Sequence, residues 1–332
     1  MRYVSNNIST VMIKLRQTGI FTLCIVFLYT LANNVLGQQK EVDKIESEEF
    51  VDYNVDLLLP FTIPDSAIQP LRTLIDTSLV TALELRLGKN KKWKSLIKQK
   101  RMAVGVVDLQ DVNKVKFARV NGNEMMYAAS LPKIAILLAA MDAMENNEIA
   151  ETPEIHADLR LMISKSNNAA STRMIDLLGY DKIETVLKDP KYELYDEVYG
   201  GGLWVGKRYA KQGNRNPDPL KGLSHAATVS QVCRFYYLMV AGKLVSPERS
   251  KQMLDIMENP ALHHKFVNTL DKVAPNARLF RKSGSWREFH SDSILVWGPE
   301  RRYILVALIV DSDGESIIRQ LVRPVEEVLE IK

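Results

Sequence analysis

The chain reads SLPKIAILLAAMDAM at residues 130–144, in which the tetrapeptide SLPK is followed by an apolar run where only Asp142 is charged. Proline is favoured in the first turn of a helix, where its missing N–H costs no hydrogen bond. The stretch therefore predicts a strongly apolar helix over residues 132–144. Residues three apart share one helix face, so the amine of Lys133 can approach the hydroxyl of Ser130.

This pair has the chemistry of an activated serine nucleophile. The N-terminal end of a helix carries positive potential that stabilises an alkoxide, and backbone N–H groups at such a turn can face an oxyanion. A lysine that is partly desolvated or close to other cations can be neutral enough to accept a proton. The same S-x-x-K spacing occurs at Ser95 and Lys98, in a basic run without an apolar helix behind it, and we interpret that copy as chance.

Two further short motifs follow in the chain. The first is Ser166-Asn167-Asn168 and the second is Lys282-Ser283-Gly284. Each motif alone is weak evidence, and Ser-Asn-Asn also occurs at residues 5–7. Because both motifs follow an S-x-x-K at a helix start, in this order, the three motifs together indicate an acyl-transfer site.

The flanking sequence predicts an α+β (mixed α/β) fold. Helices are expected at about 71–87, 154–164, 168–178, 181–188, 229–241, 247–257 and 315–330, and strands at 101–109, 115–120, 291–297 and 303–310. Strands and helices do not alternate, so a doubly wound sheet is disfavoured. We predict an antiparallel sheet formed by both chain ends, with flanking helices and an all-helical subdomain inserted at about 134–278 of a domain covering 66–332.

From about residue 66 onward the chain resembles class A β-lactamases, relatives of the penicillin-binding D,D-peptidases. The resemblance is strongest at Ser130-Leu131-Pro132-Lys133, at residues 166–170, where the family has S-D-N, and at residues 281–285, where it has K-T-G or K-S-G. It implies a β-lactamase/transpeptidase-like fold and an active-site serine hydrolase. It implies neither a metal nor a cofactor.

The resemblance also implies a role for each matched residue. Ser130 would be acylated, Lys133 would act as base or in the proton path, and Ser166 would pass a proton to the leaving nitrogen. Asn168 would bind the substrate's side-chain amide. The third motif would hold the substrate carboxylate, and the backbone N–H groups of Ser130 and Ser285 would bind the oxyanion. The implied substrate-binding positions in this region are Lys282, Ser283, Gly284 and Ser285.

Two positions depart from the family pattern. Asn167 stands where the family has Asp, mainly a structural hydrogen-bonding position. No E-x-x-L-N motif, whose Glu activates the deacylating water, is found between the second and third motifs. Glu193, Asp196 and Glu197 are acidic candidates for that base, although a solvated turn explains them equally well. Three functions stay open. The chain is an efficient β-lactam hydrolase, a penicillin-binding D,D-peptidase or esterase-like hydrolase with slow deacylation, or a catalytically weak ligand-binding or sensor protein.

The segment 201–207, GGLWVGK, nearly matches a phosphate-binding loop, but Arg208 stands where Ser or Thr should be. We interpret this region as a rim over the active site, with Trp204 and Tyr209 as wall residues. The adjacent pair His263-His264 lacks partners at metal-ligand spacing.

The N-terminal segment predicts export, and the charge balance excludes one class of partner. Residues 1–37 combine a basic leader, a short apolar stretch at 20–32 and Val35-Leu36-Gly37, which predicts a signal peptide, with an uncleaved N-terminal anchor as the rival. Without Arg2, Lys14 and Arg16 the chain has 41 basic and 40 acidic residues, which argues against nucleic acid as a partner. We expect a linker at 38–65 and a periplasmic or secreted monomer acting on a β-lactam or a cell-wall peptide.

Overall fold

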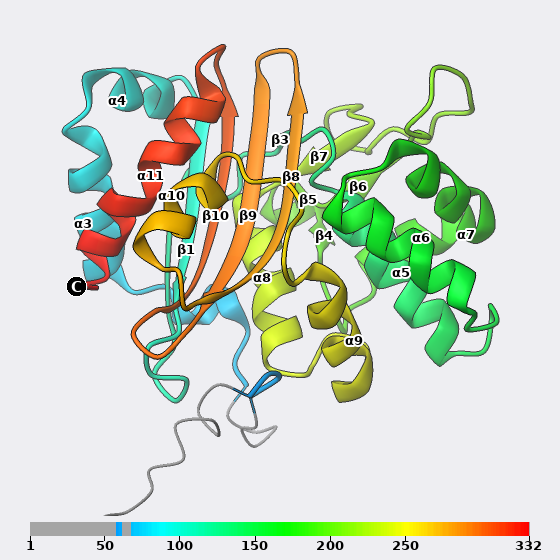
Figure 1. Cartoon of the computed structure of the whole chain (residues 1–332). Coiled ribbons are helices and arrows are strands. Elements are labelled where there is room, and N and C mark those ends of the chain that lie inside the picture. Colours follow the sequence, from blue (N-terminus) through cyan, green and yellow to red (C-terminus); the bar gives the residue numbers. More distant parts are fainter. Residues whose placement is uncertain (1–57, 62–67, 332) are drawn as a thin grey trace, which may run out of the picture. The chain divides into compact units, whose positions relative to one another are not determined.

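A five-stranded antiparallel sheet runs through the fold in the order β2-β1-β10-β9-β8 (Figure 1). Its strands are β1 (Met102–Asp108), β2 (Lys116–Val120), β8 (Arg278–Trp286), β9 (Phe289–Trp297) and β10 (Arg302–Val310). The early strands and the late strands meet where β1 pairs with β10, so both ends of the domain build one sheet, as the sequence predicts. β8, which carries the third motif, is an edge strand.

Helices cover both faces of this sheet, which explains why its central strand is apolar at successive positions. In β10 the side chains of residues 303, 305, 307 and 309 pack on one face with α3 (Thr77–Gly88), α10 (Phe266–Val273) and α11 (Gly314–Val328). The intervening residues 304, 306 and 308 pack on the other face, where α8 (Val229–Val240) lies. Successive strand side chains point to opposite faces, so a strand buried on both sides needs no polar alternation.

The predicted apolar helix is α5 (Lys133–Glu145), and eleven of its thirteen residues are buried. A helix that is apolar all round needs neighbours on every side. The neighbours are α6 (Pro153–Ser164), α7 (Asn168–Lys188) and α9 (Pro247–Met257), which surround it (Figure 1). α7 is interrupted at Gly179, whose φ of 76° separates the two helices predicted at 168–178 and 181–188.

The insertion predicted to be all helical also contains short strands between the second and third motifs. There β6 (Trp204–Val205) and β7 (His225–Ala227) form a small sheet with β3 (Met126–Tyr127), which precedes the first motif, and β4 (Tyr195–Asp196) pairs with β5 (Gly201–Gly202). One turn of 3-10 helix, η4 (Glu197–Tyr199), joins the last two. The helix α8 begins where predicted, because the Thr228 hydroxyl accepts a hydrogen bond from the N–H of Gln231.

The N-terminal helix and the basic run differ from the sequence prediction. The helix expected at 71–87 is split into η3 (Leu71–Leu74) and α3, because Asp76 caps α3 by accepting from the N–H of Leu79 at 2.8 Å. The basic run 89–101, where no helix is expected, contains the helix α4 (Lys91–Lys98), whose Trp93 and Leu96 are buried. Two apolar residues three apart suffice to dock this helix while its lysines stay solvated.

The computed structural model describes residues 58–61 and 68–331, which belong to one compact unit, 54–332. The predicted signal segment lies outside the described residues, and only 58–61 of the predicted linker is described; there Phe61 stacks on Trp297 with ring centroids 6.1 Å apart. Within the described ranges, no helix has the length and hydropathy needed to cross a membrane.

Candidate active site

Ser130 lies at the entrance to α5, next to a residue with an uncommon backbone conformation. Ala129 has φ of 51°, in the left-handed region that costs a non-glycine residue about 1–3 kcal/mol. Its carbonyl accepts a hydrogen bond from the Tyr209 hydroxyl at 3.2 Å. Surroundings that hold such a conformation fix the direction of the next residue, and Ser130 is partly exposed while Lys133 is fully buried.

The edge strand β8 passes directly beside residues 128–130, which lead into α5. A side chain at Gly284 would put its Cβ 2.3 Å from the carbonyl oxygen of Ala128 and 2.6 Å from the backbone nitrogen of Ser130. Only glycine permits this approach. The next residue, Ser285, lines the same cavity as Ser130, so the two backbone positions that the resemblance assigns to the oxyanion lie on neighbouring walls.

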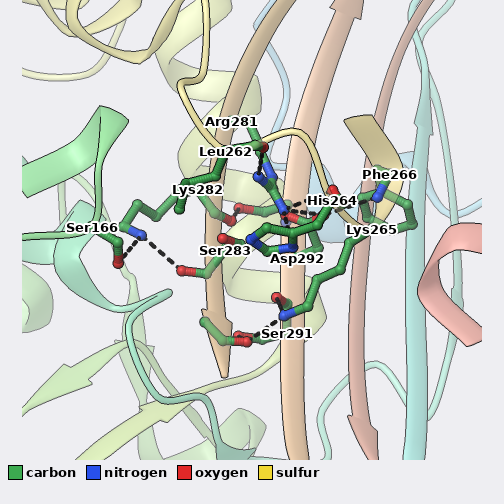
Figure 2. A network of polar contacts seen from close by, with 12 residues as sticks. Ser166, Leu262, His264, Lys265, Phe266, Arg281, Lys282, Ser283, Ser291 and Asp292 are labelled. Carbon is green, nitrogen blue, oxygen red and sulfur yellow. Dashed lines mark hydrogen bonds and ion pairs between the residues drawn. The ribbon is translucent and has the colours of Figure 1, made fainter. Parts of the chain in front are cut away.

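Ser166 joins the helical region to the edge strand (Figure 2). Its hydroxyl oxygen accepts from Lys282 Nζ at 2.9 Å and lies 3.4 Å from Lys133 Nζ. Lys133 Nζ also donates to the Ser166 carbonyl at 2.6 Å and to Asn168 Oδ1 at 2.8 Å. Asn167 caps α7 by accepting from the N–H of Ala170 at 2.8 Å, the structural hydrogen bond expected for the Asp-to-Asn departure.

The two lysine amines are strongly desolvated. Burial lowers the pKa of Lys133 to about 7. Burial, followed by the charge of Lys133, holds the pKa of Lys282 well below its usual range. Among the described residues, no carboxylate hydrogen-bonds either amine, and the Tyr209 ring lies 4.4 Å from Lys133 Nζ. A neutral amine, competent to accept a proton, is therefore accessible near neutral pH.

An open cavity of about 820 Å³ gives access to this constellation. Three of the predicted site residues, Ser130, Asn168 and Ser285, line it. Its other walls are Tyr127, Ala129, Lys207, Arg208, Tyr209, Ala210, Lys211, Arg215, Ser224, His225 and Trp286. In the part of the chain that the structure describes, the cavity has no aspartate or glutamate in its wall.

The three acidic candidates for a deacylating base lie elsewhere. Glu193 pairs with Arg72 and lies 3.6 Å from Arg234. Asp196 accepts from the N–H of Val198, and Glu197 is 3.8 Å from Lys188. The solvated-turn interpretation therefore fits these residues, and the base interpretation does not.

Of the two residues predicted to form the wall of the site, Tyr209 and Trp204, only one lines the cavity. Tyr209 is a wall residue, as predicted. Trp204 is not: it is buried, and its Nε1 donates to the carbonyl of Asn216 at 2.7 Å. His225 also lines the cavity. Its Nε2 lies 2.9 Å from the carbonyl of Lys207, so Nε2 carries the proton, and burial lowers its pKa to about 4, which keeps the ring neutral.

A buried network of hydrogen bonds and an ion pair lies behind β8, and the sequence does not predict it (Figure 2). Lys265 Nζ donates to the carbonyls of Gly284 at 2.6 Å and Ser291 at 3.0 Å, and to Ser285 Oγ at 2.8 Å. Arg281 pairs with Asp292 at 2.7 Å, and both are almost fully buried. Lys265 precedes α10 as a single lysine in an irregular segment, and nothing in its spacing signals this contact.

The sheet, the helical insertion and the residues gathered at α5 and β8 define a hydrolase of the β-lactamase fold. Residues 89–158 and 151–328 match the model of the β-lactamase enzyme family, and the chain belongs to this family. No curated protein matches the chain.

Solved structures with the same fold are distant in sequence. A β-lactamase from Sphaerobacter thermophilus is 16% identical with a TM-score of 0.56, covering 76% of this chain and 95% of its own. A class A β-lactamase representative from Bacteroides cellulosilyticus is also 16% identical, with a TM-score of 0.56 and coverage of 76% and 99%. PBP-A, in a mutant solved as an acyl-enzyme complex with penicillin G, is 21% identical with a TM-score of 0.57, covering 79% and 99%. These likenesses show the fold alone.

Proposed function

We propose that this chain is a serine hydrolase that β-lactams and related cell-wall peptides acylate at Ser130, and that it releases the acyl group slowly. The observation that carries this proposal is the Ser166 hydroxyl between two desolvated lysine amines, beside the cavity that Ser130 lines. This arrangement supplies a nucleophile, a base and a proton donor without a metal.

In the acylation step, Ser130 Oγ attacks the amide carbonyl carbon while its proton moves to neutral Lys133. The carbonyl oxygen becomes an oxyanion and accepts hydrogen bonds from the N–H groups of Ser130 and Ser285. As the C–N bond breaks, Ser166 gives its hydroxyl proton to the leaving nitrogen and regains one from Lys133, 3.4 Å away. Lys282 donates to Ser166 Oγ, which orients that hydroxyl.

Deacylation requires a base that activates water against the Ser130 ester. The described wall of the cavity holds no carboxylate, and Glu193, Asp196 and Glu197 are engaged elsewhere. Neutral His225 donates its Nε2 proton to the Lys207 carbonyl, and its unprotonated Nδ1 lies 3.1 Å from the Ser224 hydroxyl; burial lowers its pKa to about 4, which makes the ring a weak base. This favours a penicillin-binding peptidase with a long-lived acyl-enzyme over a rapid β-lactamase.

A fluorescent penicillin tests the proposal directly. The full chain should acquire fluorescence that survives denaturing electrophoresis, and Ser130→Ala should not. Ser95→Ala, which removes the serine of the second S-x-x-K, is the matched control and should label like the wild type. Equal labelling of wild type and Ser130→Ala would overturn the assignment of Ser130.

We also propose that the protein is exported, because its substrate class lies outside the cytoplasm and residues 1–37 have the pattern of a signal peptide. Fractionation of cells expressing the full chain, with N-terminal sequencing of the product, tests this. An uncut chain in the membrane fraction would support the anchor interpretation, and an uncut chain in the cytoplasm would contradict export.

A further inference from the structure

The cavity beside Ser130 is strongly basic on one side. Its wall includes Lys207, Arg208, Lys211 and Arg215 but, in the described chain, no acidic residue; of the four, Arg208 has a carboxylate partner, Asp176, which lies outside the wall. All four belong to residues 206–216, which we call the basic hairpin. Most solvated basic residues in proteins have acidic neighbours, so a cavity wall with one sign of charge is a recognition feature.

The base of the basic hairpin is fixed. The N–H of Asn216 donates to the Gly206 carbonyl at 2.8 Å, and a Cβ at Gly206 would fall 1.6 Å from the Asn216 carbonyl oxygen. Asn216 Nδ2 also donates to Glu184 at 2.9 Å, and the Tyr180 hydroxyl donates to the Asn214 carbonyl at 3.1 Å. The charges are thus presented from an anchored element.

The charged side chains of the basic hairpin extend from two different sides of it. Lys207 and Arg215 face each other in an antiparallel bridge, which puts their side chains on the same side. Arg208, the next residue, points the other way and pairs with Asp176 at 2.5 Å. Like charges directly opposite each other are destabilising. Among the described residues no carboxylate pairs with Lys207 or Arg215, so an external anion is the group that would relieve this repulsion.

The position of these charges indicates which part of a substrate they meet. The Lys207 carbonyl accepts a hydrogen bond from His225 Nε2. Burial is the main cause of the lowered pKa of His225, and the positive charges of Lys133, Lys207 and Arg215 lower it further. These charges therefore lie near His225, in the cavity that Asn168 also lines. Lys282 and Ser283, proposed to hold the substrate carboxylate, lie on β8 instead.

We propose that the basic hairpin binds a second anionic group, carried by the acyl side chain of the substrate. The preferred acyl donors are then dianionic: one carboxylate for Lys282 and Ser283, and another for Lys207 and Arg215. The exposed ring of Trp286, at the end of β8, lines the same cavity and suits an apolar part of the substrate. This inference rests on the proposed function and adds its substrate class.

Two penicillins that differ by one carboxylate provide the test. Benzylpenicillin and α-carboxybenzylpenicillin share the ring system and the phenyl group. The second-order acylation rate constant is measured for both in the wild type and in the double variant Lys207→Gln/Arg215→Gln. The charge-keeping double variant Lys207→Arg/Arg215→Lys and the distant Lys98→Gln serve as controls.

The ratio of the two rate constants is the readout. Removing two exposed charges should lower the preference for the carboxylated drug about five- to tenfold, since each exposed pair contributes up to about fivefold. The controls should keep the wild-type ratio, and added salt should reduce it. Acylation by both drugs with the same ratio in every variant would overturn the inference and leave the proposed function standing. No acylation by either drug would overturn the proposed function itself.

A matched peptide pair separates the two sources of such a substrate. N-glutaryl and N-pentanoyl forms of a D-alanyl-D-alanine peptide differ by one carboxylate at the acyl end. Faster release of D-alanine from the glutaryl form, lost in Lys207→Gln/Arg215→Gln, would assign the anion site to cell-wall peptides. A charge preference confined to the penicillins would assign it to β-lactams.

Discussion

Lys282 on the edge strand donates a 2.9 Å hydrogen bond from Nζ to the hydroxyl of Ser166, which precedes α7. The contact joins two segments separated by more than a hundred residues and closes the site between the sheet and the helical region (Figure 2). Because Lys133 approaches the same hydroxyl from α5, the three motifs form one connected network of polar contacts, which the proposed function uses as a proton path.

Ser166→Ala should slow acylation by benzylpenicillin about 100-fold, because it removes the proton donor to the leaving nitrogen. Ser164→Ala is the matched control, since Ser164 Oγ donates to the carbonyl of Arg160 on its own helix. The second-order acylation rate constant measures both. A Ser166→Ala variant that acylates within twofold of wild type would remove Ser166 from the proton path.

The acylation rate should rise with pH through about 7 and level off above it. Burial lowers the pKa of Lys133 to about 7, so the neutral amine that accepts the Ser130 proton predominates only above that pH. Stopped-flow acylation between pH 5 and pH 9 gives the profile.

A histidine side chain could also produce a rise in acylation rate near pH 7, and His225 lines the same cavity as Ser130. Burial lowers its pKa to about 4, so it is neutral throughout this range. His225→Asn should therefore keep the rise near pH 7. A profile that loses this rise in His225→Asn would assign the titration to the histidine.

Gly284→Ala should cost about 1–3 kcal/mol of unfolding free energy and most of the acylation activity. The added Cβ would overlap the carbonyl oxygen of Ala128 and the backbone nitrogen of Ser130, which pushes β8 away from the nucleophile. Gly88→Ala is the control, because nothing lies within 4 Å of a Cβ there. Urea unfolding and acylation rates check both effects, and an active, stable Gly284→Ala variant would contradict the close approach of the strand.

Lys265→Met should lower the acylation rate at saturating penicillin, because Lys265 positions Ser285 without touching the substrate cavity. Three hydrogen bonds to β8 and β9 are lost, and unsatisfied carbonyls cost about 1–3 kcal/mol each. The penicillin dissociation constant should stay within about twofold, since an oxyanion interaction develops only in the transition state. Equal losses in rate and affinity would indicate a purely structural role.

The parts of the fold governed by local patterns were predictable from the sequence. The apolar run gives α5, β10 begins one residue before the strand expected at 303–310 and ends with it, and the Thr228 cap starts α8 where predicted. The split between η3 and α3 is not predicted, because the apolar helical spacing continues across Asp76, whose side chain caps α3.

Contacts between distant segments could not be predicted in this way. Lys265 reaches Gly284 from an irregular loop, and no periodicity links the two. The pairing of Lys207 with Arg215 depends on the backbone of residues 206–216, and the partners of Glu193 come from η3 and α8. Such residues acquire their roles from tertiary packing, where local sequence carries little information.

Intact mass of the full chain during incubation with benzylpenicillin tests slow release of the acyl group from Ser130. We expect a mass gain of one penicillin on the wild type that persists for many minutes, and none on Ser130→Ala. Rapid consumption of penicillin without a lasting adduct would contradict slow deacylation. Neither adduct nor consumption would contradict acylation of Ser130 by β-lactams.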